Sequence, residues 1–313
     1  AILLVDEVER GLEPHRLAHL LSVLRLNALS PPPADGEPPP DSKALRGQVL
    51  LTTHSSVALR ALSASDLCMV TTAGQTSVRP VPDSLQDLVR AAPEALLATR
   101  VLLSEGKTEA GICRSLIPTW ESAHRGIPFM HTGAVIVSMF SGGGTKAAGY
   151  AHKLAGLGYA TALLADSDRP LSPSADDLKV ATVKVVQWAD EMCVETRALT
   201  DLPWPFVQKV LDLAIELLDE ETVTEHLRAM LAKDKSTSQL PSLFVDDWAG
   251  CGLDEAGTRL LIARTAKKKG NDWFKTIESG ERLGLLLAAA LPSISDTDLA
   301  RKLGDIGAWF YVE

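Results

Sequence analysis

Two short apolar runs that each end in carboxylates constrain this chain more than any other part of its sequence. Apolar runs of about five residues are typical of strands buried within a parallel sheet. Glu105 and Glu109 follow the run over residues 100–104, and Asp166 and Asp168 follow the run over residues 160–165. Because the carboxyl ends of parallel strands meet at one edge of a sheet, we expect these four acids to lie close together. Their mutual repulsion calls for a cation, and carboxylates are the ligands that Mg²⁺ and Mn²⁺ prefer.

The composition places the chain among ordinary globular proteins. Its 313 residues are enough for two domains, and a 46% hydrophobic and 23% charged content provides ample core. Neither a long apolar run nor a signal peptide is recognisable, so we expect a cytoplasmic protein with no membrane partner. The four cysteines lie far apart without a Cys-x-x-Cys, which argues against zinc and against a disulfide framework. The net charge of −9 argues against a general nucleic-acid coat but permits nucleic acid at a metal-neutralised site beside a basic patch.

The first residues of the chain carry a second motif. Residues 1–5 form an apolar run that ends in Asp6 and Glu7, which is the Walker B arrangement of ATPases. There the aspartate holds Mg²⁺ and the glutamate polarises the water that attacks the γ-phosphate. Another apolar run, over residues 48–53, ends at His54, which looks like the switch histidine of ABC-type ATPases, and residues 11–15 resemble their D-loop. Together these elements indicate the distal part of an ABC-type ATPase domain.

A Walker A motif, in contrast, is missing from the sequence. The motif needs a second glycine well before the glycine of its Gly-Lys-Thr. The chain has one Gly-Lys-Thr, at residues 106–108, and Val101 stands where that earlier glycine would be. No Leu-Ser-Gly-Gly signature precedes Asp6 either. We therefore expect a C-terminal fragment that does not hydrolyse ATP, with ATP a cofactor of the full-length protein only.

Periodicity and chain breakers predict the order of the remaining elements. Helices are expected over residues 14–27 and 84–97. Strands over 100–104, 134–139, 160–165 and 182–187 then alternate with helices over 108–117 and 146–157. This alternation indicates a parallel sheet flanked by helices. Residues 203–290 favour amphipathic helices, over 206–218, 223–231, 254–266 and 272–290.

The acidic motifs resemble those of a known domain. Glu-Gly-x-Thr-Glu at residues 105–109, followed by Asp-x-Asp at 166–168, looks like the Toprim domain of topoisomerases, primases and some nucleases. Walker B and switch-histidine elements directly before it resemble the OLD (overcoming lysogenisation defect) ATPase–nucleases. The resemblance implies an α/β fold, with a Toprim-type parallel sheet, a helical insertion and a partial ABC-ATPase lobe. It divides the chain into an ATPase part (1–97), a Toprim core (98–200), a helical insertion (201–265) and a C-terminal part (266–313).

In that family the Toprim acids bind two divalent ions that cleave DNA. The resemblance implies that Glu105 ligates a metal or acts as the general base, that Glu109 ligates the second metal, and that Asp166 and Asp168 flank the ions. A further acid is expected after the strand over 182–187. The candidates are Asp190, Glu191 and Glu195. We favour Glu195, and Glu191, one turn earlier, is the alternative for the same role.

Two further groups of residues are candidates for contact with phosphate. Lys275, in Asp-Trp-Phe-Lys, resembles the single catalytic lysine of the family, and Lys269 is the alternative. Lys268, in the triple lysine 267–269, is expected to contact a DNA phosphate. The loop before the helix over 146–157 contains Gly142, Gly143, Gly144 and Lys146. Glycines there let backbone amides approach a phosphate. The same loop partly matches a dinucleotide fingerprint, or it is a tight turn that binds nothing.

Three functional classes follow from these patterns. The first is a DNA endonuclease or nickase that uses two Mg²⁺ or Mn²⁺ ions and is regulated by the ATPase domain in the full-length protein. The second is another Toprim chemistry, of the topoisomerase or primase type. The third is a Toprim-like module that binds DNA without catalysis. The resemblance also implies homodimerisation of the full-length protein, a helicase partner, and a role in phage defence or DNA repair.

Overall fold

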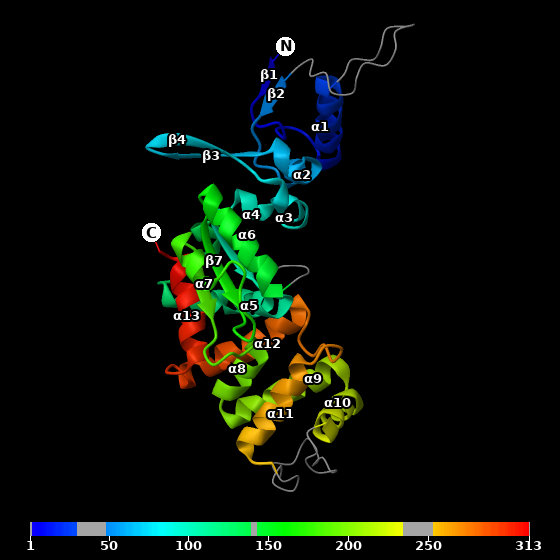
Figure 1. Ribbon diagram of the computed structural model, residues 1–313, viewed down its shortest axis with the longest axis vertical. Coiled ribbons are helices and arrows are strands. Elements are labelled where there is room, and N and C mark those ends of the chain that lie inside the picture. The colour runs from blue at the N-terminus through cyan, green and yellow to red at the C-terminus, as the bar shows by residue number, and fades with distance from the viewer. Residues whose placement is uncertain (1, 30–47, 139–142, 234–252, 313) are drawn as a thin grey trace. The chain divides into compact units, whose positions relative to one another are not determined.

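The computed structural model describes residues 2–29, 48–138, 143–233 and 253–312 (Figure 1). The chain separates into two compact units, Ala1–Ala98 and Thr99–Glu313, and each is described by itself. Taken singly, none of the described helices combines the length and the apolar character needed to cross a membrane.

The first unit is built on two parallel strands. Strand β1 (Ile2–Val5) pairs with β2 (Gln48–Leu51). Helices α1 (Pro14–Leu29) and α2 (Ser56–Ala61) accompany them. The small core of this part consists of Val8, Leu17, Leu21 and Ala58. An antiparallel hairpin of β3 (Cys68–Ala73) and β4 (Gln75–Pro80) follows.

The prediction of one helix over residues 84–97 is wrong. A 3₁₀ turn (Asp83–Leu85) leads into α3 (Gln86–Ala91), and a separate α4 (Glu94–Leu97) follows. Pro93 is the reason, because proline disfavours the helical conformation of the residue before it. Ala92 accordingly leaves the helical region, with φ −142° and ψ 62°.

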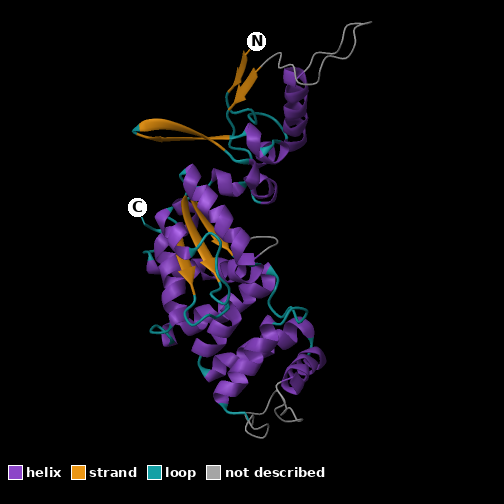
Figure 2. Ribbon diagram, viewed as in Figure 1, coloured by secondary structure: helices purple, strands orange, loops and turns teal. Residues whose placement is uncertain are grey.

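The second unit is an α/β structure around one parallel sheet, as the sequence predicts. Its strands are β5 (Arg100–Ser104), β6 (Ala134–Ser138), β7 (Ala160–Ala165) and β8 (Lys184–Gln187), in the order β6-β5-β7-β8. All three pairings are parallel. The intervening helices are α5 (Lys107–Ala123), α6 (Gly143–Leu157) and α7 (Ala175–Val180). Figure 2 shows the strands among these helices. Because right-handed crossovers run in opposite directions from β5 to β6 and from β6 to β7, α5 and α6 lie on opposite faces.

Helices make up the rest of the second unit. They are α8 (Val194–Asp201), α9 (Trp204–Leu218), α10 (Glu220–Lys233), α11 (Glu255–Lys267), α12 (Ile277–Ala290) and α13 (Asp298–Phe310). The helix predicted over 272–290 therefore begins later, at Ile277. Thr276 is the reason, since its side chain accepts a hydrogen bond from the amide of Ser279 and caps α12.

Helices α5 and α12 pack with almost no side chain between them. A Cβ atom on Gly280 would lie 2.6 Å from the carbonyl oxygen of Thr108, and one on Gly284 would lie 2.8 Å from Cα of Ile112. These separations are too short for any side chain, so only glycine allows the two backbones to meet here. The contact lies beside the first turn of α5, and that turn carries Glu109.

Candidate functional site

The sheet brings the ends of β5 and β7 together. Ser104 is opposite Leu164 in the parallel register, and the amide of Glu105 donates to the carbonyl of Leu164 at 2.9 Å. Beyond the last pair, Oε2 of Glu105 accepts a hydrogen bond from the amide of Asp166 at 3.0 Å. Glu105 and Asp166 are therefore neighbours at the carboxyl edge of the sheet.

Glu109 reaches this edge from the first turn of α5. Its side chain is buried, with 5% of the residue exposed. Oε2 of Glu109 folds back toward Gly106, where an added Cβ would lie only 2.7 Å away. The glycine between the two glutamates in Glu-Gly-x-Thr-Glu thus makes room for the second one. The amino-terminal end of α5 also favours a negative charge at this position.

Asp166 accepts hydrogen bonds from residues at the end of β8 and at the start of α8. Its Oδ1 accepts from the indole Nε1 of Trp188 at 3.2 Å and from the amide of Val194 at 2.9 Å. Its carbonyl oxygen accepts from Nε2 of Gln187 at 2.9 Å. The sequence motifs did not single out Trp188, so its contact with an acid was missed.

Glu195 and Lys275 meet although 80 residues separate them in the chain. Glu195 lies in the first turn of α8, is 3% exposed, and forms an ion pair with Lys275. Glu191 instead lies in an exposed turn with φ 54°. The structure therefore brings the favoured acid, rather than its alternative, to the lysine.

The loop that carries Lys275 is anchored on both sides. The hydroxyl of Thr108 donates to the carbonyl of Phe274 at 2.6 Å, which ties the loop to the start of α5. The indole of Trp273 donates to Nδ1 of His226 at 3.1 Å, which ties it to α10. Burial acts to lower the pKa of Lys275, but the charge of Glu195 and hydrogen bonding to it raise the pKa overall. Lys275 is therefore a protonated donor near neutral pH.

The acids at this edge of the sheet raise one another's pKa. Burial, followed by the charges of Glu195 and Glu105, raises the pKa of Glu109 to about 7. Burial also raises the pKa of Asp166 to about 9, and the four other acids of the cluster add to the shift. We call these five residues the acidic cluster: Glu105, Glu109, Asp166, Asp168 and Glu195. With so much negative charge at one edge, the cluster holds protons or another cation near neutral pH.

The donor chemistry of the acidic cluster fits a hard divalent cation. Every member offers carboxylate oxygens, the ligand type of Mg²⁺ and Mn²⁺. In this conformation no three His, Cys, Asp or Glu side chains, among the residues that the structure describes, converge tightly enough to hold one metal ion. Ion binding therefore requires the carboxylates to move together. Oδ2 of Asp168 forms an ion pair with Nζ of Lys267 at 3.8 Å. A bound metal ion would compete with Lys267 for this carboxylate.

The predicted phosphate contacts are distributed around this edge. Gly142 lies outside the described residues, whereas Gly143 and Gly144 begin α6 and Lys146 is exposed in its first turn. Lys268 follows α11 directly and is partly buried, and Lys269 is exposed. No contact of Lys146, Lys268 or Lys269 with the acidic cluster is seen in the described part of the chain.

In the first unit, Asp6 and Glu7 follow the end of β1, and His54 follows the end of β2. The hydroxyl of Thr52 donates to Oδ1 of Asp6 at 2.5 Å and accepts from the amide of Glu7 at 2.9 Å. The amide of His54 donates to Oε1 of Glu9 at 2.6 Å. Burial acts to raise the pKa of Glu9, but hydrogen bonds from His54 and Thr53 lower it overall. Glu9 therefore joins the two strand ends, a role that the sequence did not suggest.

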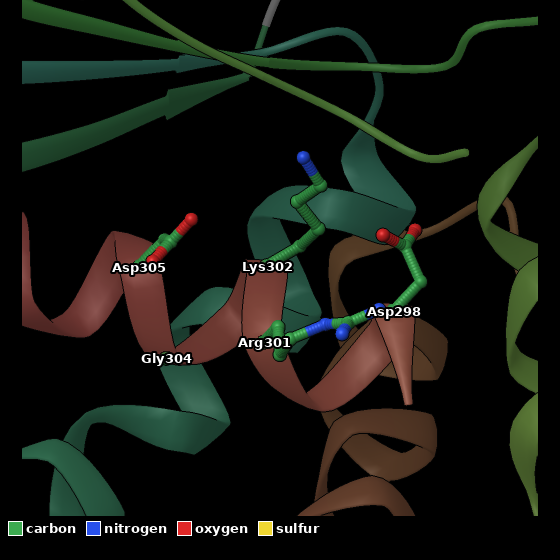
Figure 3. Close-up of a pocket in the computed structure, with 5 residues that line it drawn as sticks. All are labelled: Asp298, Arg301, Lys302, Gly304 and Asp305. Carbon is green, nitrogen blue, oxygen red and sulfur yellow. The ribbon is translucent and has the colours of Figure 1, made fainter. Parts of the chain in front are cut away.

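A hollow of about 510 Å³ lies on α13 (Figure 3). Its lining residues all come from this one helix and mix two acids with two bases: Asp298, Arg301, Lys302, Gly304 and Asp305. None of them belongs to the acidic cluster. The mixed charge gives this surface no preference for either sign of ligand.

Comparison with known proteins agrees with the architecture of the first unit. Residues 1–60 match the family model of the AbiEii toxin-type AAA domain, described with the type IV TA system. This match supports an AAA/ABC-type ATPase-like domain at the N-terminus. No curated protein matches the chain.

Proposed function

We propose that the chain is a divalent-metal-dependent DNA endonuclease or nickase of the Toprim type. The observation that carries this proposal is the acidic cluster with Lys275 at the carboxyl edge of a parallel sheet. Open α/β sheets place their sites at that edge. Carboxylates that raise one another's pKa without matching cations are costly for stability, and such arrangements concentrate at functional sites.

Each residue has a distinct part in the proposed hydrolysis. Glu109, Asp166, Asp168 and Glu195 would hold two Mg²⁺ or Mn²⁺ ions, with Glu105 as a ligand or as the base for the attacking water. Bound ions of this kind activate water and stabilise the leaving oxygen of a phosphodiester. The ammonium of Lys275 lies beside Glu195 and is placed to donate to a phosphate oxygen as charge develops there.

DNA is the substrate that the surrounding charges favour. Lys146, Lys268 and Lys269 would contact backbone phosphates around the acidic cluster, which makes binding independent of sequence and sensitive to salt. The acidic chain as a whole does not attract DNA, so this local basic group has to supply the affinity. We expect the glycines that begin α6 to approach a phosphate through their amides.

The finer family assignment also belongs to this proposal. An ATPase-like domain followed by the Glu-Gly-x-Thr-Glu and Asp-x-Asp elements supports an OLD-type ATPase–nuclease. Where a phosphate-binding loop completes the ATPase-like domain, ATP, homodimerisation and a helicase partner would regulate cleavage in the cytoplasm. Phage defence or DNA repair would be the setting.

The test is cleavage of supercoiled plasmid by the purified chain. We would add Mg²⁺, Mn²⁺ or Ca²⁺ without ATP, and compare Glu109→Gln and Asp168→Asn with a control, Asp176→Asn. Asp176 is a suitable control because its side chain is 92% exposed on α7. We expect metal-dependent nicking that both site variants lose and the control keeps. Cleavage that survives both site variants would refute the assignment of the acids.

A DNA-binding module without catalysis is the second candidate. It is favoured by the ion pair between Lys275 and Glu195, which supplies a cation to the acidic cluster without metal. The absence of a three-ligand group among the described residues points the same way. Under this alternative the chain binds DNA equally with and without Mg²⁺, and it leaves the plasmid intact.

A further inference from the structure

We propose that Trp188 is a positioning residue that fixes the carboxylate of Asp166 for ion binding. The inference rests on the proposed metal site and adds a residue to it. Nothing in the motif pattern pointed to this tryptophan. The geometry around Asp166 carries the inference.

The parallel register places the two residues side by side. Strands β7 and β8 are paired, with Ala165 opposite Gln187 at their ends. Asp166 and Trp188 are the next residues of the two strands, so they leave the sheet together. Gln187 reinforces the arrangement through its hydrogen bond to the carbonyl oxygen of Asp166.

Burial leaves the indole of Trp188 dependent on Asp166. Trp188 is only 2% exposed, so its N–H cannot turn to bulk water. The hydrogen bond from Nε1 to Oδ1, at 3.2 Å, satisfies this buried donor.

Both donors to the carboxylate of Asp166 use the same oxygen. The amide of Val194, at the start of α8, also donates to Oδ1, at 2.9 Å. No hydrogen bond to Oδ2 is present among the described residues. Asp166 thus has one oxygen committed to the protein and one open to an ion. Partners of this kind orient metal ligands in other metal sites.

The loop that precedes α8 is hydrogen-bonded to the residue after Asp166. The amide of Met192 donates to the hydroxyl of Ser167 at 2.9 Å, and the amide of Ser167 donates to the carbonyl of Met192 at 3.0 Å. This pair links the residue after Asp166 to the residue two before Val194. The loop therefore holds the two donors to Oδ1 in a fixed relation.

The test is the affinity of the ATP-free chain for Mn²⁺, measured by calorimetry with Trp188→Phe. Phenylalanine keeps an aromatic ring but removes the donor. We expect Mn²⁺ binding to weaken by about tenfold or more, while the thermal midpoint stays within a few degrees of the unaltered chain. Trp120→Phe is the matched control, because Trp120 is also buried in the same hydrophobic core.

A second variant removes the other donor by a different route. Val194 is the first residue of α8, where proline is well tolerated, so Val194→Pro deletes the amide without breaking the helix. We expect it to weaken Mn²⁺ binding as well. Unchanged Mn²⁺ affinity in Trp188→Phe would overturn the positioning role alone. No Mn²⁺ binding by the unaltered chain would overturn the metal site, and with it the role assigned to Trp188.

Discussion

The carboxylate of Glu105 accepts a hydrogen bond from the backbone amide of Asp166, with 3.0 Å between Oε2 and N. This bond joins the ends of two neighbouring strands, so the distance between the two acids is set by the backbone of the sheet. Oε1 is then the oxygen of Glu105 that remains for an ion or for the attacking water. The two acids are therefore spaced by strand pairing, before any cation binds.

Replacing Glu109 by glutamine should separate stability from activity. Ionising this buried acid is costly, since its pKa is raised to about 7. At pH about 8.5 in EDTA, we expect Glu109→Gln to raise the unfolding free energy by about 2 kcal/mol. The same variant should lose metal-dependent nicking. Urea unfolding and the plasmid assay measure the two effects. Lower stability together with full activity would identify Glu109 as a structural acid.

The stability of the metal-free chain should fall as pH rises. The pKa of Asp166 is about 9 in the folded chain, compared with an ordinary value of 3.8 in the unfolded chain. Between these values the folded state binds more protons, so its stability is fully present below pH about 4 and declines as pH increases toward about 9. Urea unfolding across this range should show the decline, and Asp166→Asn should flatten it. A stability that rises over the same range would contradict the raised pKa.

Loss of Lys275 should leave Glu195 without its cation. We expect Lys275→Ala to lower the unfolding free energy by about 1–2 kcal/mol, less than for a fully buried pair because the lysine is 41% exposed. Adding Glu195→Gln should restore stability but not nicking. Lys269→Ala, on an exposed neighbour, is the control and should unfold like the unaltered chain. Additive losses in the double variant would show that the two residues are not coupled.

A methyl group at Gly280 should disturb both the fold and the site. The added Cβ would lie 2.6 Å from the backbone of Thr108, so α12 has to move away from α5. We expect Gly280→Ala to cost about 1–3 kcal/mol and to reduce nicking, since Thr108 also anchors the Lys275 loop. Gly149→Ala is the matched control, because an added Cβ there meets nothing within 4 Å. Equal thermal midpoints for the two variants would contradict the close contact.

ATP should have no effect on this chain. Asp6 and Glu7 follow an apolar run, as in a Walker B motif, but the sequence has no Gly-x-x-x-x-Gly-Lys-Thr/Ser cradle for the phosphates. We expect no phosphate release from ATP and the same nicking rate with and without it. A malachite-green phosphate assay beside the plasmid assay measures both. Phosphate release that disappears in Glu7→Gln would show that another cradle completes the site.

The parallel sheet could be predicted because its signal is local. Each strand is an apolar run, and the residues after it are forced to one edge, which accounts for the proximity of Glu105 and Asp166. The choice between Glu191 and Glu195 needed the structure. Glu191 has a positive φ in a turn, whereas Glu195 lies inside α8 and faces Lys275. Hydrophobic periodicity does not register such a turn.

Other features could not be read from the sequence, because they depend on distant partners. Trp188 looks like any core aromatic until β8 is paired with β7, and Glu9 looks like a surface acid until it meets the residues after β2.

The late start of α12, in contrast, had a local signal in the sequence that could have been used. Thr276 and Ser279 form a capping box at its first turn.

The backbone contact between α5 and α12 has a practical consequence. Because Gly280 meets Thr108 without side chains, the frame that holds Glu109 and Lys275 does not depend on the charges it displays. A chain carrying Glu109→Gln should then keep the shape of the site while lacking its chemistry. Such a chain would be a substrate trap, whose captured nucleic acid could be recovered intact and sequenced.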